Sequence, residues 1–286
     1  MSRGLRRRLA LGLPTLLGLA ERGFFLPHRY AGSWPRRVRD NAYPELAESF
    51  RAAEPALLAL LETMERHAPA LRAIGDAPPS APRWRQSWFP RLDAAAAYVL
   101  LRERRPRRLV EVGSGHSTRF FRRAAQDGDF ALAITAIDPA PRADIAALPI
   151  TLHRRLLQEL VLAPGPGPFD GLGAGDVVSL DSSHLLVPGS DVDLFFGRVL
   201  PRLPLGCLLQ IHDIFLPDDY PPAWDWRGYN EQQVLPPLLQ GGGWRILWSS
   251  RWAATRLSER VAKGVAGSLP LMPGALETSL WLERVR

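Results

Sequence analysis

Two pairs of acidic and histidine residues follow neighbouring apolar runs in the second half of the chain. Asp181 and His184 come after one run, and His212 and Asp213 come after the next. Carboxylates and imidazoles so placed can bind a divalent cation. Alternatively, a histidine can act as a general base while a carboxylate orients it. Both chemistries stay open at this point, and so does a structural role for each histidine.

A second group of functional residue types lies earlier, around an apolar run that ends in a glycine-containing turn. The group comprises Glu111, Gly113, Ser114, Gly115 and Ser117. A strand, a tight glycine turn and a helix N-terminus let backbone amides approach a nucleotide-like ligand closely. Asp138 ends the next apolar run, 27 residues after Glu111, which suits one intervening helix. An acid at that position usually binds ribose hydroxyls.

Two classes of cofactor are bound by this arrangement, and the sequence distinguishes them. The dinucleotide motif Gly-x-Gly-x-x-Gly would place its third glycine at Thr118, where it is absent. An acid two residues before the first glycine, here Glu111, is typical of the Glu/Asp-x-Gly-x-Gly loop of S-adenosylmethionine-dependent methyltransferases. A further glycine that this loop often carries would fall at Ser117. A strand–turn–helix without any ligand is the remaining alternative.

Bulk composition indicates a globular chain and gives no sign of a nucleic-acid-binding protein. The chain has 286 residues, of which 46% are hydrophobic, enough for a sizeable core. Its net charge is +7, but the basic residues are almost all arginine and Lys263 is the only lysine. No basic run with stacking aromatics forms a recognisable RNA- or DNA-binding module. We therefore expect no nucleic-acid partner.

The elements that must position these residues alternate between strands and helices, as in a doubly wound sheet. Strands are expected at 108–112, 133–138, 149–153, 176–181, 207–213, 244–248 and 278–285. Helices are expected at 92–104, 117–126 and 230–239, and a helical region at 44–74. Because ligands bind at the carboxyl ends of such strands, the acids there should converge on one crevice. A proline-rich linker at 77–82 divides an N-terminal extension (1–82) from the main domain (83–286).

Taken together, the motifs resemble a bacterial family of class I S-adenosylmethionine-dependent methyltransferases. This is the family grouped with macrocin/mycinose-type sugar O-methyltransferases and cephalosporin-hydroxylase-like proteins, and the likeness covers about 84–252. It rests on Glu111-Val-Gly-Ser-Gly-His-Ser-Thr, Ile137-Asp138-Pro139, Asp181-Ser-Ser-His184, Gly189-Ser190-Asp191 and His212-Asp213-Ile214-Phe215. It implies an α/β fold, a Rossmann-like seven-stranded methyltransferase sheet with an N-terminal helical extension.

The resemblance also implies roles for individual residues. The cofactor-binding set would be Glu111, Gly113, Ser114, Gly115, Ser117, Asp138 and Asp181. In the sugar-modifying relatives, acids after the fourth and fifth strands hold Mg²⁺, which binds neighbouring hydroxyls of the acceptor. Asp181 and Asp213 match those metal positions. Relatives often have Glu-Asp where this chain has His212-Asp213, and this difference favours His212, with Asp213, as the catalytic pair.

The segment Pro217–Glu231 mixes Tyr and Trp with Asp, Arg and Asn. Such a loop suits a saccharide or aromatic acceptor, although its aromatics can equally pack on the sheet. The expected function is O-methylation of a small polar acceptor in the cytoplasm. The alternatives are an NAD-dependent oxidoreductase and a non-catalytic, membrane-associated cofactor-binding protein.

The N-terminus combines a basic run with a short apolar stretch. Arg6, Arg7 and Arg8 precede an apolar segment, 9–20, that contains two glycines and a proline. The segment is too short to span a bilayer, and no clean signal-peptide cleavage site follows it. A basic, interrupted apolar helix can instead lie on an anionic membrane surface, so we expect peripheral membrane contact through residues 1–25. A helix that docks on the domain is the alternative.

Overall fold

The computed structural model describes residues 3–23, 28–33, 43–75 and 77–286. The chain divides into two compact units. We call residues 43–217 and 230–286 the sheet unit, and residues 1–42 together with 218–229 the N-terminal unit. Residues 1–2 and 24–25 of the segment predicted to contact membranes lie outside the described residues.

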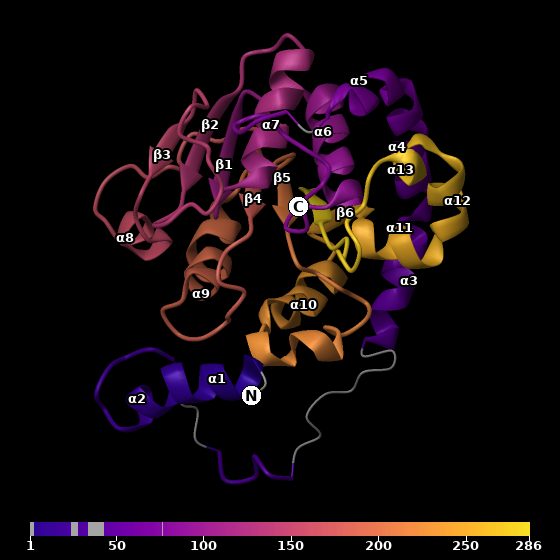
Figure 1. The fold of residues 1–286 in the computed structure, drawn as a ribbon. Helices are drawn as coiled ribbons and strands as arrows, with labels where there is room; N and C mark the ends of the chain where they lie inside the picture. Colours follow the sequence, from indigo (N-terminus) through magenta and orange to yellow (C-terminus); the bar gives the residue numbers. More distant parts are fainter. Residues whose placement is uncertain (1–2, 24–27, 34–42, 76) are drawn as a thin grey trace. The chain divides into compact units, whose positions relative to one another are not determined.

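The sheet unit is built on seven strands in the order β3-β2-β1-β4-β5-β7-β6 (Figure 1). The strands are β1 (Arg108–Val112), β2 (Ala133–Ile137), β3 (Thr151–His153), β4 (Val177–Leu180), β5 (Leu208–Ile211), β6 (Trp244–Ser249) and β7 (Leu280–Arg284). The first five are parallel, and β7 runs antiparallel to both β5 and β6. The predicted Rossmann-like seven-stranded fold is confirmed.

The strand order reverses beside β1. From β1 the chain proceeds to β2 and β3 on one side, and it then returns to place β4 on the other side. Helices that leave adjacent strands in opposite directions open a crevice at the carboxyl edge of the sheet, where such folds bind ligands. The predicted residues Asp138, Asp181 and His212 each follow the last residue of a strand and therefore lie along this edge.

Helices cover the sheet as their apolar spacing predicts. The expected helices correspond to α6 (Arg91–Arg104), α7 (His116–Asp127) and the pair η5 (Glu231–Val234) and α10 (Leu235–Gln240). The other helices between β3 and β5 are α8 (Leu157–Val161), α9 (Asp191–Leu194), η2 (Phe195–Val199) and η3 (Leu200–Arg202). Helices α6 and α7 pack against each other (Figure 1). The N-terminus of α6 is joined to the segment just before β7, where the Glu277 carboxylate accepts hydrogen bonds from the Arg91 side chain and the Leu92 amide.

Three short helices follow β6, where the sequence indicated none: α11 (Ser250–Arg256), α12 (Ser258–Lys263) and α13 (Val265–Ser268). Helices this short are marginal without tertiary packing. Here the Ser249 hydroxyl accepts from the Trp252 amide and caps α11. The Trp252 ring stacks on Phe50 at a centroid distance of 5.7 Å. Contacts across the fold, rather than local propensity, therefore stabilise this region.

The predicted N-terminal extension, 1–82, is divided in the structure. Its helices α3 (Pro44–Ala52), α4 (Glu54–Arg66) and α5 (Ala68–Ala73) belong to the sheet unit. Helix α4 packs on α6 and β6, and the Glu65 carboxylate accepts a hydrogen bond from the Val265 amide at 2.6 Å. Apolar residues of α3 to α5 are part of the core of the sheet unit.

The N-terminal unit contains α1 (Arg3–Arg7), the π-helical turn η1 (Arg8–Gly12), α2 (Leu13–Leu16) and the 3₁₀ helix η4 (Pro222–Arg227). The first three are continuous and form one helical segment. Among the described residues, no helix combines the length and the apolarity that crossing a membrane requires.

Candidate active site

The glycine loop after β1 is held in shape by a buried carboxylate. Glu111 is fully buried, and its two oxygens accept hydrogen bonds from the hydroxyls of Ser117 and Thr118. The Thr118 hydroxyl also accepts from the Gly115 amide at 2.9 Å. Burial raises the pKa of Glu111 to about 8, although both hydroxyl groups lower it in part. Thr118 thus closes the loop at the position where a dinucleotide motif has its third glycine.

Only glycine is compatible with position 113. Gly113 has a φ of +79°, and a Cβ atom built there would lie 1.7 Å from the Asp181 carbonyl oxygen. The Gly113 amide donates to the Ile137 carbonyl at 2.9 Å, and the Asp181 amide donates to the Val112 carbonyl at 2.9 Å. The glycine loop and the end of β4 are therefore in direct contact.

Asp138 is joined to the same loop. One oxygen of its carboxylate accepts from the Ser114 amide at 2.8 Å and from the Ser114 hydroxyl at 2.9 Å. The other oxygen accepts from the Ala140 amide at 2.8 Å. Asp138 and the loop residues 113–115 are half-buried, whereas Glu111 and Ser117 are buried. Of the predicted cofactor-binding residues, the half-buried ones are accessible to a ligand, while Glu111 and Ser117 shape the loop.

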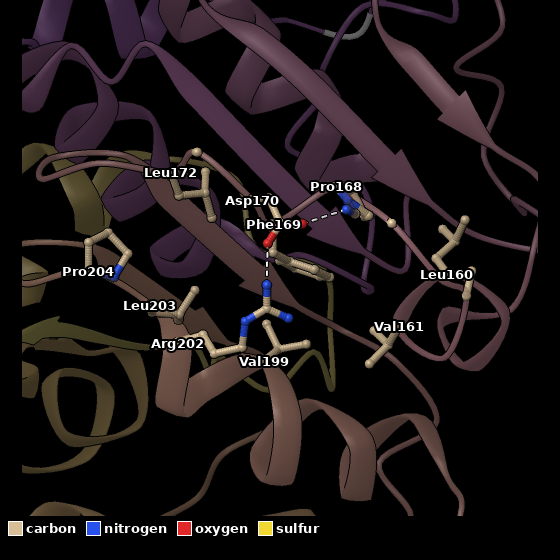
Figure 2. A pocket seen from close by; sticks show the side chains of 14 residues that line it. Leu160, Val161, Pro168, Phe169, Asp170, Leu172, Val199, Arg202, Leu203 and Pro204 are labelled. Carbon is tan, nitrogen blue, oxygen red and sulfur yellow. Dashed lines mark hydrogen bonds and ion pairs between the residues drawn. The ribbon is translucent and has the colours of Figure 1, made fainter.

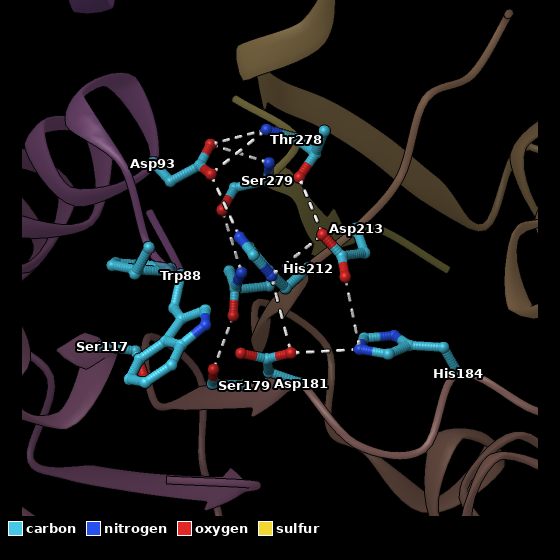
Figure 3. Close-up of polar contacts among 12 residues, drawn as sticks. Trp88, Asp93, Ser117, Ser179, Asp181, His184, His212, Asp213, Thr278 and Ser279 are labelled. Atoms are coloured by element: carbon cyan, nitrogen blue, oxygen red, sulfur yellow. Dashed lines mark hydrogen bonds and ion pairs between the residues drawn. The ribbon is translucent and has the colours of Figure 1, made fainter. Parts of the chain in front are cut away.

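Four side chains converge after β4 and β5, and we call them the His–Asp cluster: Asp181, His184, His212 and Asp213 (Figure 3). Asp181 Oδ1 lies 3.2 Å from His184 Nε2 and 3.5 Å from His212 Nδ1. The two Asp213 oxygens lie 3.5 Å from the same two nitrogens. Of the acids expected to converge at the strand ends, Asp181 and Asp213 therefore lie together with the two histidines. The carboxylates of Glu111 and Asp138 make separate contacts on the same edge of the sheet.

Each imidazole of the cluster is backed by a buried carboxylate that sequence reasoning missed. His212 Nε2 lies 3.1 Å from Asp93 Oδ2, and His184 Nδ1 lies 2.8 Å from Glu231 Oε2. Asp93 also accepts hydrogen bonds from the backbone amides of Thr278 and Ser279. Such pairing fixes the ring orientation and the tautomer of a histidine. In a neutral ring, the proton would sit on the nitrogen that faces Asp93 or Glu231, and the other nitrogen would face the cluster.

Two cluster residues have left-handed backbone conformations. His184 has a φ of +60° and Asp213 a φ of +57°. Non-glycine residues rarely adopt this region, and conformations of this kind concentrate at functional sites. The backbone at the ends of β4 and β5 is therefore arranged to aim these two side chains into the cluster.

The electrostatics of the cluster favour charged side chains. Burial alone lowers the pKa of His212, but Asp181, Asp213 and Asp93 outweigh it and raise the pKa well above the ordinary value. The pKa of His184 is raised in the same way, through Asp181, Glu231 and Asp213. Burial raises the pKa of Asp181, but the two histidines more than reverse this and lower it. Both imidazoles are therefore stabilised as cations at neutral pH.

The donor set does not fit the Mg²⁺ ion expected at Asp181 and Asp213. Magnesium prefers an octahedron of oxygen ligands and retains several waters. Here two imidazoles lie between the two carboxylates and already supply positive charge. Within the described part of the chain, no group of three or more His, Cys, Asp or Glu side chains is arranged to hold a metal ion.

Aromatic side chains border the start of α7. Trp88 is 56% exposed, and its ring lies 5.7 Å from the His116 ring. Burial, with smaller contributions from Arg119 and Arg83, lowers the pKa of His116 to about 4. His116 is thus neutral, and its Nδ1 has no hydrogen-bond partner among the described residues. Sequence reasoning did not assign Trp88 to the site, although it stands in an aromatic segment, Trp84–Phe89, just before α6.

The aromatic residues predicted to meet an acceptor all belong to the N-terminal unit. Within the N-terminal unit, the Arg227 guanidinium lies 4.0 Å from the centroid of the Trp224 ring. The rings of Trp224 and Tyr229 meet edge to face at 5.9 Å. These side chains therefore pack on one another. Glu231, at the end of the same segment, belongs to the sheet unit and contacts His184.

A separate pocket lies near the amino ends of β1 and β4, away from the cluster (Figure 2). Mostly apolar side chains line it, and an ion pair joins Arg202 to Asp170 within its wall. The Asp170 carbonyl accepts from the Arg108 side chain at the first residue of β1, at 2.8 Å. None of the predicted site residues lines this pocket.

The chain matches no protein-family model, and no curated protein matches it in sequence. Solved structures similar to it include the S-adenosylhomocysteine-bound methyltransferase PaMTH1 of Podospora anserina. That likeness has 14% identity, covers 92% of this chain and all of the other, and has a TM-score of 0.41. The O-methyltransferase of Bacillus cereus with S-adenosylhomocysteine gives 12% identity, 80% and 91% coverage, and a TM-score of 0.38. The mycinamycin-pathway methyltransferase MycE, with Mg, S-adenosylhomocysteine and mycinamycin VI, gives 17% identity, 65% and 47% coverage, and a TM-score of 0.32.

Proposed function

We propose that this protein transfers a methyl group from S-adenosylmethionine to a hydroxyl oxygen of a small polar acceptor. The observation that carries this proposal is the contact between the glycine loop and the His–Asp cluster. Gly113 approaches the backbone of Asp181 so closely that no larger residue fits. A loop suited to a nucleoside cofactor and a cluster suited to proton transfer therefore adjoin each other where β1 and β4 end.

The loop residues account for cofactor binding. The half-buried backbone of Gly113, Ser114 and Gly115 admits a ligand, and the Asp138 carboxylate beside Ser114 would accept hydrogen bonds from ribose hydroxyls. Glu111 would act by positioning the loop. The exposed face of Trp88 near α7 offers a stacking surface for a flat ring. When bound, S-adenosylmethionine supplies a methyl group on a positively charged sulfur that leaves as a neutral thioether.

His212 is suited to take the proton of the acceptor hydroxyl. At a pH above the raised pKa of His212 the ring is neutral, and Asp93 would then hold the ring proton on Nε2, so that Nδ1 could accept a proton from the hydroxyl. A hydroxyl gains more from such a base than an amine does, because a neutral amine attacks with its own lone pair. This consideration favours oxygen over nitrogen as the methyl acceptor.

The other cluster members would position the acceptor. Asp181 is the more exposed of the two cluster carboxylates, with 31% of its side chain accessible. Its lowered pKa keeps it ionised, so it can accept hydrogen bonds from acceptor hydroxyls without competing for their protons. His184, backed by Glu231, neutralises part of the charge. Because methyl transfer requires in-line geometry, such positioning should supply much of the rate.

The pH dependence of the reaction follows from the electrostatics of His212. The groups that face this ring are Asp93 from α6, Asp181 after β4, and Asp213 beside it. They raise the pKa of His212 above the ordinary histidine value of about 6.5. Turnover should therefore fall as the pH drops through a value above 6.5, rather than near 6.5 as for an unperturbed ring.

Cofactor binding tests the first half of the proposal. Isothermal titration with S-adenosylmethionine, S-adenosylhomocysteine and NAD should show binding of the first two and not of NAD. The Thr118 side chain, which closes the loop where the dinucleotide motif needs glycine, predicts this preference. Binding of NAD alone would support the oxidoreductase instead.

Methyl transfer tests the second half. A panel of hydroxylated metabolites and saccharides is incubated with the protein and S-adenosylmethionine, with and without a chelator. We expect His212→Gln to lose transfer while it keeps cofactor affinity, and we expect the chelator to have no effect. His67→Gln is the matched control, because His67 pairs with Glu103 at 2.7 Å outside the cluster. Full activity of His212→Gln would exclude His212 as the general base. Loss of activity with the chelator would support a metal-dependent mechanism instead.

A further inference from the structure

The helical segment from Arg3 to Leu16 in the N-terminal unit has two different sides. Leu5, Leu9, Leu13 and Leu16 recur at intervals of four, four and three residues, which places them along one side of a helix. These four side chains are 47 to 60% exposed. Leu17 and Leu19 continue the exposed apolar residues past the end of α2. We call these six residues the outer leucine face.

The opposite side of the segment packs within its own unit. A Cβ atom at Gly4 would lie 3.8 Å from Trp226 Cβ, and the Arg7 guanidinium lies 5.4 Å from the centroid of the Trp226 ring. Farther along, Thr15 accepts a hydrogen bond from the Arg22 amide at 3.0 Å, so the chain after α2 folds back onto this side. One side of the segment therefore packs against the remainder of the N-terminal unit, while the outer leucine face is exposed to solvent.

Positive charge adjoins the outer leucine face. Arg6 and Arg8 lie in the first turns and are exposed, whereas Arg7, between them, packs over Trp226 on the opposite side. Glu21 is the only acidic residue between positions 3 and 23. Long arginine side chains can extend from an apolar surface so that the guanidinium reaches a polar, anionic layer. The combination matches the boundary between acyl chains and anionic headgroups.

We infer that residues 3–20 bind an anionic lipid surface, with the outer leucine face inserted and the arginines at the headgroups. The inference is independent of the proposed methyl transfer. An in-plane orientation follows because the exposed leucines extend along the segment from Leu5 to Leu19, and Gly12, Pro14 and Gly18 interrupt its apolar run.

The N-terminal unit also contains residues 218–229 of the loop after β5. That loop is linked to the cluster by chain connectivity: it starts five residues after Asp213 and ends just before Glu231, which contacts His184. Lipid binding would therefore engage the same compact unit that carries this loop.

Vesicle flotation of the full chain tests the inference. At low salt we expect the protein to float with vesicles of phosphatidylcholine containing phosphatidylglycerol, and to remain below vesicles of phosphatidylcholine alone. High salt should release it, because screening weakens arginine–headgroup attraction. The double variant Leu9→Glu/Leu13→Glu should bind at least about tenfold more weakly, since it places charge in the inserted face.

The matched control is Leu205→Glu, which alters a leucine of the sheet unit that is 60% exposed. It should float like the unchanged chain. Titration with S-adenosylmethionine and thermal melting establish that each variant is folded. Failure of the unchanged chain to float with anionic vesicles would overturn the inference. So would undiminished flotation of the double variant, or a double variant whose only defect is a change of oligomeric state.

Discussion

The substitution Asp93→Asn tests the pairing of Asp93 with His212 while it leaves the other residues of the site unchanged. Asp93 Oδ1 accepts from the amides of Thr278 and Ser279, both at 2.9 Å, while Oδ2 faces His212 Nε2 at 3.1 Å. An asparagine oxygen can retain the two amide bonds in the Oδ1 position. Its NH₂ group then faces His212 and favours the tautomer with the proton on Nδ1. That nitrogen can no longer accept a proton from the acceptor.

Two magnitudes follow from this geometry. Loss of one hydrogen bond to a charged group costs about 1.5–3 kcal/mol of stability. Loss of a positioned general base lowers the rate about 10²–10⁴-fold, which corresponds to roughly 3–5 kcal/mol in the activation barrier. The effect on kcat should therefore exceed the effect on folding. Cofactor affinity should stay within about threefold, because Asp93 does not touch the glycine loop.

The assay compares kcat for methyl transfer, the dissociation constant for S-adenosylmethionine and the denaturation midpoint. Asp176→Asn is the control, since Asp176 is also buried and accepts from backbone amides, those of Arg108 and Gly173, at the other end of the sheet. It should lose stability and keep kcat. If Asp93→Asn kept kcat within about threefold of the unchanged protein, the assignment of His212 as a base would be refuted.

Three further substitutions test the glycine loop. Burial raises the pKa of Glu111 in the folded state, so the unchanged protein should lose stability as the pH rises from 4.5 towards 8. Glu111→Gln lacks this ionisation, and its free energy of unfolding should gain on that of the unchanged protein by at most about 4 kcal/mol over the range. A constant difference between the two proteins across these pH values would contradict the prediction. Gly113→Ala should cost several kcal/mol of stability because its Cβ would clash with the Asp181 carbonyl. The control Gly189→Ala is also at positive φ but has open space around it, and it should cost only about 1–2 kcal/mol. Equal urea midpoints for the two variants would disprove the clash. Asp138→Ala should weaken S-adenosylmethionine binding by about 2–4 kcal/mol, or roughly 30- to 1,000-fold, and an unchanged titration would remove Asp138 from the cofactor site.

Much of the sheet could be predicted because its signals are local. The bounds of β1 are those expected from its apolar run, and the other strands differ from expectation by a residue or a few at their ends. Glycine at position 113 signalled a turn that other residues cannot make, and the structure gives the reason in its positive φ and its contact with Asp181. The helices after β6 were missed because packing, including that of Trp252 on Phe50, stabilises them.

The candidate site was predictable only where its residues adjoin strands. Asp181, His212 and Asp213 follow β4 and β5 directly, and parallel strands bring such residues to one edge. The position of Asp93 in the sequence did not indicate a functional role. An acid in the first turn of a helix is common because the helix dipole stabilises it. Glu231 was part of the predicted acceptor segment, but nothing in its local sequence indicated that it would be buried against His184.

The sequence by itself determined the order of strands and helices, the glycine loop and the edge of the sheet where polar residues gather, since each depends on short-range periodicity or on the backbone freedom of glycine. Only the tertiary structure decided the electrostatic surroundings of the two cluster histidines. Those depend on carboxylates brought from distant positions: Asp93 lies 119 residues before His212, and Glu231 lies 47 residues after His184. Electrostatic energy inside a protein depends on distance in space and on exclusion of water, and neither quantity can be obtained from separation along the chain.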